Sequence, residues 1–334
     1  MKEERIPLIC LAHLDWDHVW QRPQQLMTRL TRHFDVVYID PPHMLDGLMQ
    51  PELRALRVDQ GVRVYKPCFP HVPAEYWQYW KSLLPTVLAA AGAAPVLWVY
   101  SPLSDRLVEQ LADQSLLAVY DCMDDLASFR GASAEMRIRE ERLLGLVDLV
   151  FTGGKSIYEA RQARHAHVYC FPSGVDVEHY GQAYAEQTAI ADAIATIPHP
   201  QLGYFGVLDE RIDWPLIAAI AARRPEWHWT LVGPTAKVTP EELPRAANIH
   251  YLGKQAYTDL PTFLKSFDIA TMPFALNAAT RFISPTKTPE YLAGGKWGSA
   301  ARSPMSSPPT AASSILSRVS TPGSRRSRSG FKNP

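Results

Sequence analysis

Residues 201–233 read QLGYFGVLDERIDWPLIAAIAARRPEWHWTLVG, and their pattern indicates the fold. Two apolar runs of strand length, QLGYF and HWTLV, flank an amphipathic segment of helical length, WPLIAAIAAR. Parallel strands cannot be joined by a tight turn and need a longer crossover, which is usually a helix. The stretch therefore predicts a strand, a helix and a second strand of a parallel sheet.

The same alternation extends in both directions along the chain. Further apolar runs occur at IPLICLA, DVVYID, VLWVY, LLAVYD, DLVFTG, HVYCFPSG, NIHYLG and DIATMPF. The pattern predicts an α/β fold of two doubly wound lobes, residues 1–178 and 179–296, with a linker near residues 176–185. Ligands of open α/β sheets bind beyond the carboxyl ends of the strands, so the residues after each run are candidates for a site.

Composition and charge are those of an ordinary soluble protein. The chain has 34 Lys and Arg against 34 Asp and Glu, so no global charge indicates nucleic acid as a partner. The four cysteines form no CxxC pair, and we expect them to be reduced. We see no signal sequence, and the most apolar window, residues 83–100, contains two prolines and a glycine. We therefore expect a cytoplasmic chain, with peripheral association at the inner face of the cell membrane left open.

In the first lobe, polar side chains follow two predicted strands. They are His13, Asp15, Trp16 and Asp17 after IPLICLA, and Asp121, Asp124 and Asp125 in YDCMDD. The three neighbouring carboxylates could bind a metal, raise one another's pKa, or cap the following helix. No further ligand at metal-binding spacing is visible, so we expect no metal.

In the second lobe, a glycine and three cations follow the predicted strands. Gly206 allows a ligand to approach the backbone closely, and Arg211 comes shortly after it. Lys254 follows NIHYLG, and Lys287 precedes a predicted helix. Together these groups predict a pocket for a diphosphate.

The helix after Lys287 has a clear predicted start. Thr288 is expected at the N-cap, with a proline and Glu290 in the first turn. Glu290 can serve as a partner of the helix dipole. Its carboxylate can also accept two hydrogen bonds from a ribose diol.

Eight motifs occur in the order WxxxWQRPQxL, VYDCMDD, FTGG, FPSGVD, GYFGVLDER, WTLVGP, YLGK and SPTKTPEYLAGGK. In this order the chain resembles GT-B glycosyltransferases of the family 4 type, especially a teichuronic-acid-type branch for surface polysaccharides. The likeness covers residues 6–296. It implies two Rossmann-like lobes facing a cleft, an acceptor on the first lobe and a nucleotide sugar on the second. It also implies retention of anomeric configuration without a metal.

The resemblance implies donor-site roles for residues of SPTKTPEYLAGGK. Glu290 matches the second Glu of the family's E-x7-E element, which holds the donor ribose. Ser284, Thr286 and Lys287 would line the phosphates and the donor sugar. The first Glu of the element would fall at Phe282, which leaves the donor sugar undetermined.

The resemblance also implies catalytic groups. Arg211 and Lys254 lie near the family's cations that neutralise the diphosphate leaving group, although the usual Arg and Lys five residues apart are not present. His13 and Asp121 are the candidates for the catalytic residue on the acceptor side.

The pattern breaks at residue 297. Residues 297–334 contain eleven serines, five prolines and no acidic residue, so we expect a disordered basic tail. The family has a Pro-Val-Val-Ser strand after GGK, and that strand is not recognisable here. Codons for residues 305–311 can be chosen so that a shift of one base encodes Asp-Val-Val-Ala-Pro-Tyr-Gly, close to the family pattern. We therefore expect a frameshift, a second lobe incomplete at its C-terminal end, and weak or no activity.

The sequence thus predicts a transfer of sugar from a UDP- or GDP-sugar to a cell-surface polysaccharide or a lipid-linked precursor, with no further cofactor. Two alternatives stay open. One is a catalytically silent protein that binds nucleotide sugars as a scaffold, and the other is a sugar-nucleotide epimerase on the same fold.

Overall fold

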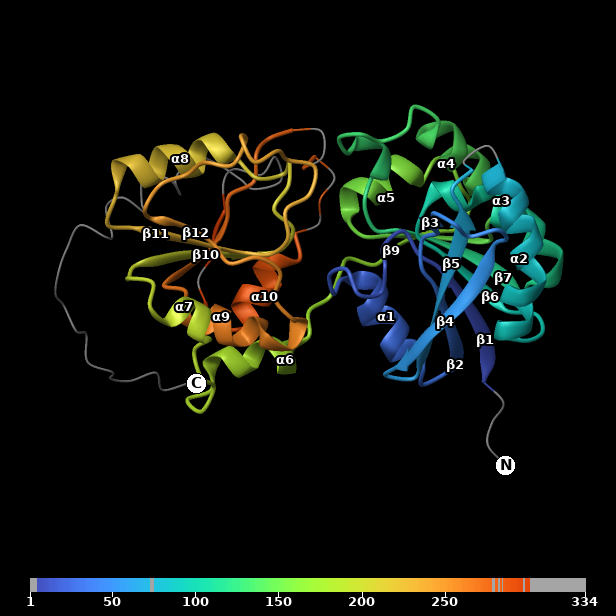
Figure 1. Ribbon diagram of the computed structural model, residues 1–334, viewed down its shortest axis with the longest axis horizontal. Coiled ribbons are helices and arrows are strands. Elements are labelled where there is room, and N and C mark those ends of the chain that lie inside the picture. The colour runs from blue at the N-terminus through green and yellow to red at the C-terminus, as the bar shows by residue number, and fades with distance from the viewer. Residues whose placement is uncertain are drawn as a thin grey trace, which may run out of the picture.

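The computed structural model describes residues 5–72, 75–277, 280–281, 283, 285–296 and 298–300. Over these residues the chain forms two sheets, one in each of two lobes that lie side by side (Figure 1). The expected tail therefore lies almost wholly outside the described residues, and so do Phe282 and Ser284.

The first lobe contains a nine-stranded sheet among the described residues, in the order β3-β5-β2-β1-β6-β7-β8-β9, with β4 paired to β5. The strands are Ile6–Leu11 (β1), Phe34–Ile39 (β2), His43–Leu45 (β3), Glu52–Asp59 (β4), Val62–Pro70 (β5), Val96–Val99 (β6), Leu117–Cys122 (β7), Leu149–Thr152 (β8) and Val168–Cys170 (β9). β1 lies between β2 and β6, so the strand order reverses direction there. Such a switch point opens a crevice at the carboxyl ends of the strands.

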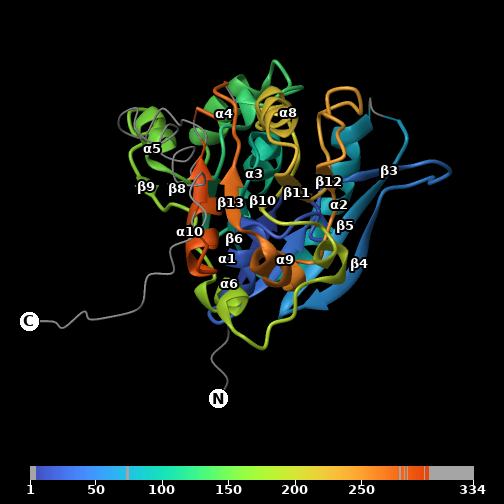
Figure 2. The same cartoon turned by 90° about the vertical axis from the view of Figure 1, so that its left-hand side faces the viewer.

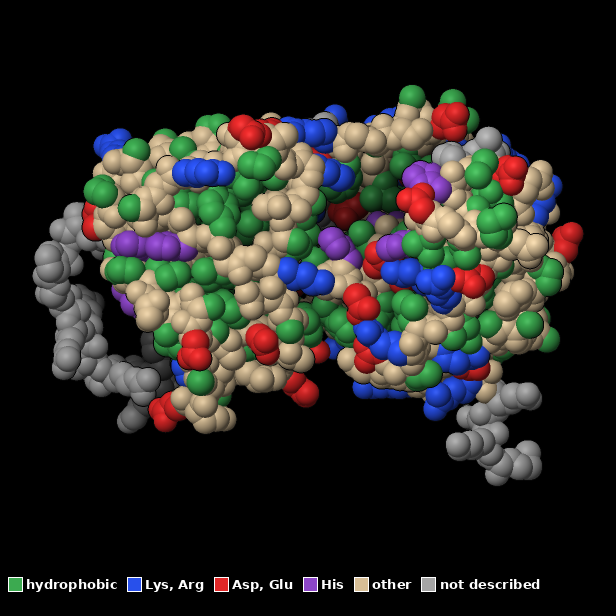
Figure 3. Space-filling view, in the orientation of Figure 1, with side chains coloured by type: hydrophobic (Ala, Val, Ile, Leu, Met, Phe, Trp, Pro, Cys, Tyr) green, Lys and Arg blue, Asp and Glu red, His purple; other side chains and the backbone are tan. Residues whose placement is uncertain are grey.

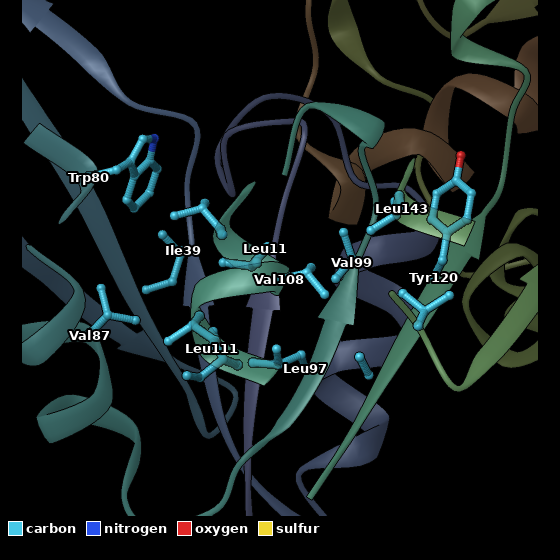
Figure 4. Close-up of a cluster of buried hydrophobic side chains, with 14 of the residues drawn as sticks. Leu11, Ile39, Trp80, Val87, Leu97, Val99, Val108, Leu111, Tyr120 and Leu143 are labelled. Atoms are coloured by element: carbon cyan, nitrogen blue, oxygen red, sulfur yellow. The ribbon is translucent and has the colours of Figure 1, made fainter. Parts of the chain in front are cut away.

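Helices cover both faces of the first sheet. α1 (Arg22–Leu30) packs on one face, and α2 (Tyr76–Ala91), α3 (Asp105–Leu111), α4 (Met136–Leu144) and α5 (Lys155–Arg161) on the other. Val87 of α2, Val108 of α3 and Leu143 of α4 meet the strand residues Leu97 and Val99 in one buried cluster (Figure 4). Burial of each such side chain stabilises the fold by about 1.5–3 kcal/mol.

The hairpin of β4 and β5 was not predicted from the sequence. β4 is antiparallel to β5, with Glu52 opposite Cys68 and Asp59 opposite Val62. Five of its central residues are exposed, so the strand has no apolar run to mark it. Its position depends on backbone pairing with β5, which a single-sequence pattern does not reveal.

The second lobe contains a five-stranded parallel sheet in the order β12-β11-β10-β13-β14. Its strands are Gln201–Phe205 (β10), His228–Val232 (β11), Ile249–Tyr251 (β12), Ile269–Met272 (β13) and Gly298–Ala300 (β14). α8 (Trp214–Arg223) covers one face, and α6 (Val177–Gly181), α7 (Asp192–Ala195), α9 (Leu260–Ser266) and α10 (Lys287–Ala293) lie on the other (Figure 2). The predicted strand, helix and strand of residues 201–233 are confirmed as β10, α8 and β11.

β14 corrects the expectation that no strand follows GGK. Gly298 pairs with Ala270 and Ala300 with Met272, in parallel register. The edge of β13 offers backbone N–H and C=O groups that can pair with a chain of almost any composition. A short strand can therefore form here although no apolar strand sequence follows GGK.

The linker expected near residues 176–185 is also corrected. Residues 177–184 form α6 and a short 3-10 helix, and Tyr180 and Ala183 are buried in the core of the second lobe. The chain passes between the lobes earlier, at residues 171–176, which have no regular structure. The side chains of Tyr180 and Ala183 are apolar enough to be buried, so this segment packs in the second lobe and does not form the connection between the lobes.

Two further expectations concern residues 83–100 and the cysteines. Residues 83–100 form the end of α2, a turn and β6, as predicted. No helix among the described residues is long and apolar enough to cross a membrane. Cys10, Cys68, Cys122 and Cys170 are all free thiols.

Candidate active site between the lobes

Two adjoining cavities lie between the lobes, where the space-filling surface is hollowed (Figure 3). The first has a volume of about 490 Å³ and the second about 420 Å³. Both are lined by residues from each lobe, and they share Val19, Trp20, Tyr180, Gly206 and Lys287. Gly206 and Lys287 therefore stand where the two cavities meet.

The end of β10 is shaped by two glycines. Gly206 has φ +144° and its N–H donates to the carbonyl of Val232 at 2.9 Å. Gly233, at the end of β11, has φ +147°, and a Cβ on it would lie 1.8 Å from the carbonyl oxygen of Gly206. Only glycine fits at position 233. Gly206 lines both cavities, so a ligand there can approach its backbone.

Lys287 and Glu290 form the charged part of the second-lobe wall. Lys287 Nζ donates to Glu290 Oε2 at 2.7 Å and lies 4.9 Å from the centre of the Phe205 ring. Both side chains are mostly buried, at 18% and 13% exposed. Burial raises the pKa of the adjacent Tyr180 hydroxyl well above its ordinary value, and the Glu290 carboxylate adds to this rise. Thr286, another predicted donor residue, lines the same cavity.

The start of α10 differs from the prediction. The helix begins at Lys287, and the N-cap position is Thr286 instead of Thr288, without a hydrogen bond from the cap side chain. Pro289 therefore lies inside the first turn, where its missing N–H costs nothing because that group has no helical partner.

Arg211 lines the first cavity and is already paired. Its guanidinium bonds both carboxylate oxygens of the buried Asp209, with Nε at 2.9 Å from each. Burial opposes the charged form, but these hydrogen bonds raise the pKa of Arg211 above its ordinary value. Arg211 thus remains a cation whose charge is largely compensated by Asp209.

Asp121 does not line either cavity, which corrects its assignment as a catalytic candidate. It is fully buried and accepts two hydrogen bonds from Arg22 Nε at 3.0 Å, and one from Trp98 Nε1 at 3.3 Å. Arg22 also donates to the carbonyl of Phe171 at 2.6 Å. A carboxylate held in this way positions Arg22 and cannot reach a substrate.

Asp124 occupies the place expected for Asp121. It lines the first cavity and is partly buried. Burial raises its pKa above the ordinary value, and Arg211 across the cleft opposes the rise. Asp124 was one of the three carboxylates in YDCMDD, but spacing alone did not show which one faces the cleft. No group of three or more His, Cys, Asp or Glu in the described part of the chain is placed to hold a metal ion.

His13 lies outside the lining of both cavities, which corrects the second acceptor-side candidate. Its ring lies 5.8 Å from that of Tyr100, and its Nδ1 is buried without a hydrogen-bond partner. Burial, with a contribution from His18, lowers the pKa of His13 to about 4. A neutral, enclosed imidazole of this kind supports the packing of the loop.

Lys254 connects the two lobes. It lines the second cavity, and its Nζ donates to the backbone carbonyl of Asp17 in the first lobe at 2.5 Å. Beside it Gln25 donates to the Tyr257 hydroxyl at 2.7 Å, and Tyr257 stacks on Trp20. The predicted cation is therefore part of a contact between the lobes.

Several lining residues were missed by the sequence reasoning. Arg22 and Gln25 belong to the WxxxWQRPQxL motif, to which no role was assigned from the sequence. Phe171 follows β9 and Trp98 lies within β6. The signal for Trp98 and Phe171 was position near the carboxyl end of a strand, which many other residues share.

Comparison with known proteins places the fold. No family model matches the chain. The structure is similar to the sucrose-phosphate synthase of Thermosynechococcus elongatus, with 15% identity, a TM-score of 0.61, and coverage of 89% of this chain and 81% of that one. It is similar to Anabaena HepE in complex with UDP-glucose, with 14% identity, a TM-score of 0.61, and coverage of 89% and 80%. The chain has the GT-B fold that was predicted.

One curated relative shares sequence with the chain. It is TuaH of Bacillus subtilis strain 168, whose name describes a glycosyltransferase of teichuronic acid biosynthesis. The two are 31% identical over 98 residues, which is 28% of this chain and 25% of the relative. The match therefore spans a quarter of the length of that relative.

Proposed function

We propose that the chain is a glycosyltransferase that takes a sugar from a nucleotide-sugar donor. The observation that carries the proposal is the group formed by Gly206, Lys287 and Glu290 where the two cavities meet. It combines close backbone approach, a mostly buried cation and a carboxylate within one helical turn. Such groups can bind the diphosphate and the ribose of a nucleoside diphosphate, and the structural neighbours, which include HepE in complex with UDP-glucose, agree with this class of ligand.

The chemistry follows from an exchange of partners. Lys287 and Glu290 neutralise each other in an ion pair. A bound donor would give its diphosphate to Lys287 and its ribose diol to Glu290, so each group keeps a partner. As the bond from the anomeric carbon to the phosphate breaks, negative charge grows on the leaving diphosphate, and Lys287 stabilises it. Arg211 lines the same cavity and adds positive potential, reduced by Asp209.

The finer assignment rests on the resemblance and on the name of the curated relative. We propose a retaining, metal-independent transfer from a UDP- or GDP-sugar to a cell-surface polysaccharide or its lipid-linked precursor. In the cell this reaction would take place in the cytoplasm or at the inner face of the membrane, where such donors and precursors meet.

We also propose that the codons after residue 296 are read in a shifted frame and that activity is reduced as a result. β14 pairs only three residues with β13. Sequencing of the gene across codons 290 to 334 tests this directly. We expect one of the two other reading frames to encode Pro-Val-Val-Ser after codon 296. If none of the three frames encodes it, the frameshift is refuted.

A catalytically silent nucleotide-sugar-binding protein is the second candidate, because Arg211 is compensated by Asp209 and the position of the first Glu holds Phe282. The experiment is calorimetric titration with UDP and GDP, followed by an assay of nucleoside diphosphate release from the donor. Binding with release supports the transferase. Binding without release, in a chain whose reading frame has been repaired, supports the silent protein. Absence of binding for both nucleotides overturns the proposed function.

A further inference from the structure

The first-lobe wall of the 490 Å³ cavity is rich in aromatic rings. Trp98 from β6, Phe151 from β8 and Phe171 after β9 all line it. The ring centres of Trp98 and Phe151 lie 5.5 Å apart, and those of Phe151 and Phe171 lie 5.0 Å apart. Phe171 is 51% exposed, and its backbone carbonyl is held by Arg22. The wall therefore presents a fixed apolar surface to the cavity.

The described cations of this wall already form ion pairs with carboxylates. Among the described lining residues from the first lobe they are Arg22 and Arg29. Arg22 pairs with the buried Asp121, and Arg29 pairs with Asp176 at 2.7 Å. An anion that bound Arg22 would leave the fully buried Asp121 without a counter-charge, which is costly. Unlike Glu290, Asp121 does not line the cavity, so it cannot turn to the ligand instead. The lining residues described on this wall include no cation other than Arg22 and Arg29.

The free charge on this wall is negative. Asp124 lines the cavity, and its carboxylate accepts no hydrogen bond from a side chain among the described residues. A carboxylate can accept hydrogen bonds from two hydroxyl groups of one sugar ring. Asp124 would repel an anion placed against the aromatic rings. This charge distribution favours a neutral acceptor over an anionic one.

We propose that this wall binds the acceptor through an uncharged sugar ring, whose apolar C–H face lies on Phe171 and Trp98 and whose hydroxyls donate to Asp124. The inference rests on the proposed function and names the acceptor class of the same site. A pocket with mostly apolar walls and one orienting polar group is the usual form of such a site. Donor and acceptor would then meet between Asp124 and Lys287, each on its own side of the cleft.

The test measures acceptor binding apart from donor binding. Methyl glycosides of neutral hexoses and glucose 6-phosphate are titrated in the presence of saturating UDP, with ligand-observed NMR as the readout. We expect the neutral glycosides to bind more tightly than glucose 6-phosphate. Phe171→Ala and Asp124→Asn should each weaken glycoside binding by about tenfold. Tyr169→Ala is the matched control, since Tyr169 belongs to the same aromatic group but does not line the cavity.

The outcomes separate the inference from the proposed function. Tighter binding of glucose 6-phosphate, absence of glycoside binding, or equal effects of Phe171→Ala and Tyr169→Ala would each overturn the inference. UDP affinity, measured alone by calorimetry, reports on the proposed function and should be unchanged in all three variants. Circular dichroism of each variant confirms that a loss of binding is not a loss of fold.

Discussion

Lys287 Nζ lies 2.7 Å from Glu290 Oε2 in the first turn of α10, beside the backbone of Gly206. The pair is enclosed between the lobes, so neither charge is well solvated. A mostly buried ion pair has a high desolvation cost, which it repays best when a ligand offers additional hydrogen bonds. This geometry suits a site whose two charges are to be separated by a substrate.

Replacement of Glu290 by Ala should weaken UDP binding by roughly tenfold to a hundredfold, because two hydrogen bonds to a charged group are lost. Calorimetry measures the affinity. Glu226→Ala serves as the control, since Glu226 is an exposed residue paired with Arg224 away from the cavities. Equal affinity of Glu290→Ala and the unaltered chain would remove Glu290 from the donor site.

Lys287 and Lys254 should differ in their effect on UDP binding. Lys287→Met removes a mostly buried cation at the junction of the cavities, and we expect roughly a tenfold or greater loss of affinity. Lys254→Met removes an exposed cation that contacts Asp17 across the lobes, so a smaller loss is expected. A larger loss for Lys254→Met would assign the diphosphate to the second cavity instead.

Asp121→Asn should destabilise the fold by about 3–5 kcal/mol, because it leaves the buried guanidinium of Arg22 without a counter-charge. The double variant Arg22→Met/Asp121→Leu should recover much of this loss, since no buried charge remains. Urea unfolding of the three proteins gives the values. Normal stability combined with lost activity in Asp121→Asn would show that Asp121 acts in the chemistry and does not position Arg22.

Gly233→Ala should cost at least about 3 kcal/mol, from the strained φ and from overlap with Gly206. UDP binding should fall with it, because the backbone at Gly206 would have to move. Gly174→Ala is the control, since a Cβ there meets no atom within 4 Å. Thermal unfolding of both variants is the measurement, and equal midpoints would contradict the close approach of the two strand ends.

His13 should make the free energy of unfolding decrease as the pH is lowered below neutrality. Its pKa is lowered from 6.5 to about 4 by burial and by His18, so between these values the unfolded chain binds more protons than the folded chain. The stabilisation from neutral His13 is complete above pH 6.5 and is lost as the pH falls through 4, and it amounts to about 3 kcal/mol at most. Urea unfolding from pH 7 to pH 4 measures it. The difference between the unaltered chain and His13→Gln should shrink over this range, and parallel curves would contradict the assignment.

Much of the fold was predictable because its signals are local. The apolar runs from IPLICLA to DIATMPF correspond to strands, since a strand buried on both faces needs a short, continuous apolar run. β3, β4, β5 and β14 were not predicted. β3 and β14 have three residues each and β4 is mostly exposed, so these strands depend on a neighbour for pairing. The N-cap of α10 lies two residues before the predicted one, because Thr286 and Thr288 are both residues that favour this position.

The candidate site was predictable only in part. Gly206, Arg211, Thr286, Lys287 and Glu290 all line the first cavity. Ser284 lies outside the described residues. On the first lobe the sequence indicated the right segment, YDCMDD, but the wrong carboxylate, because three aspartates within five positions give no information on which one is buried against an arginine.

The sequence by itself thus determined the alternation of strands and helices and the strand ends that face the cavities, because both depend on periodicity within a few residues. Only the tertiary structure decided which charges face the cleft. Arg22 and Asp121 are 99 positions apart and neutralise each other in the core, whereas Asp124, three residues further on, faces the cavity. Charge compensation depends on distance in space and on burial, and neither is encoded in local pattern.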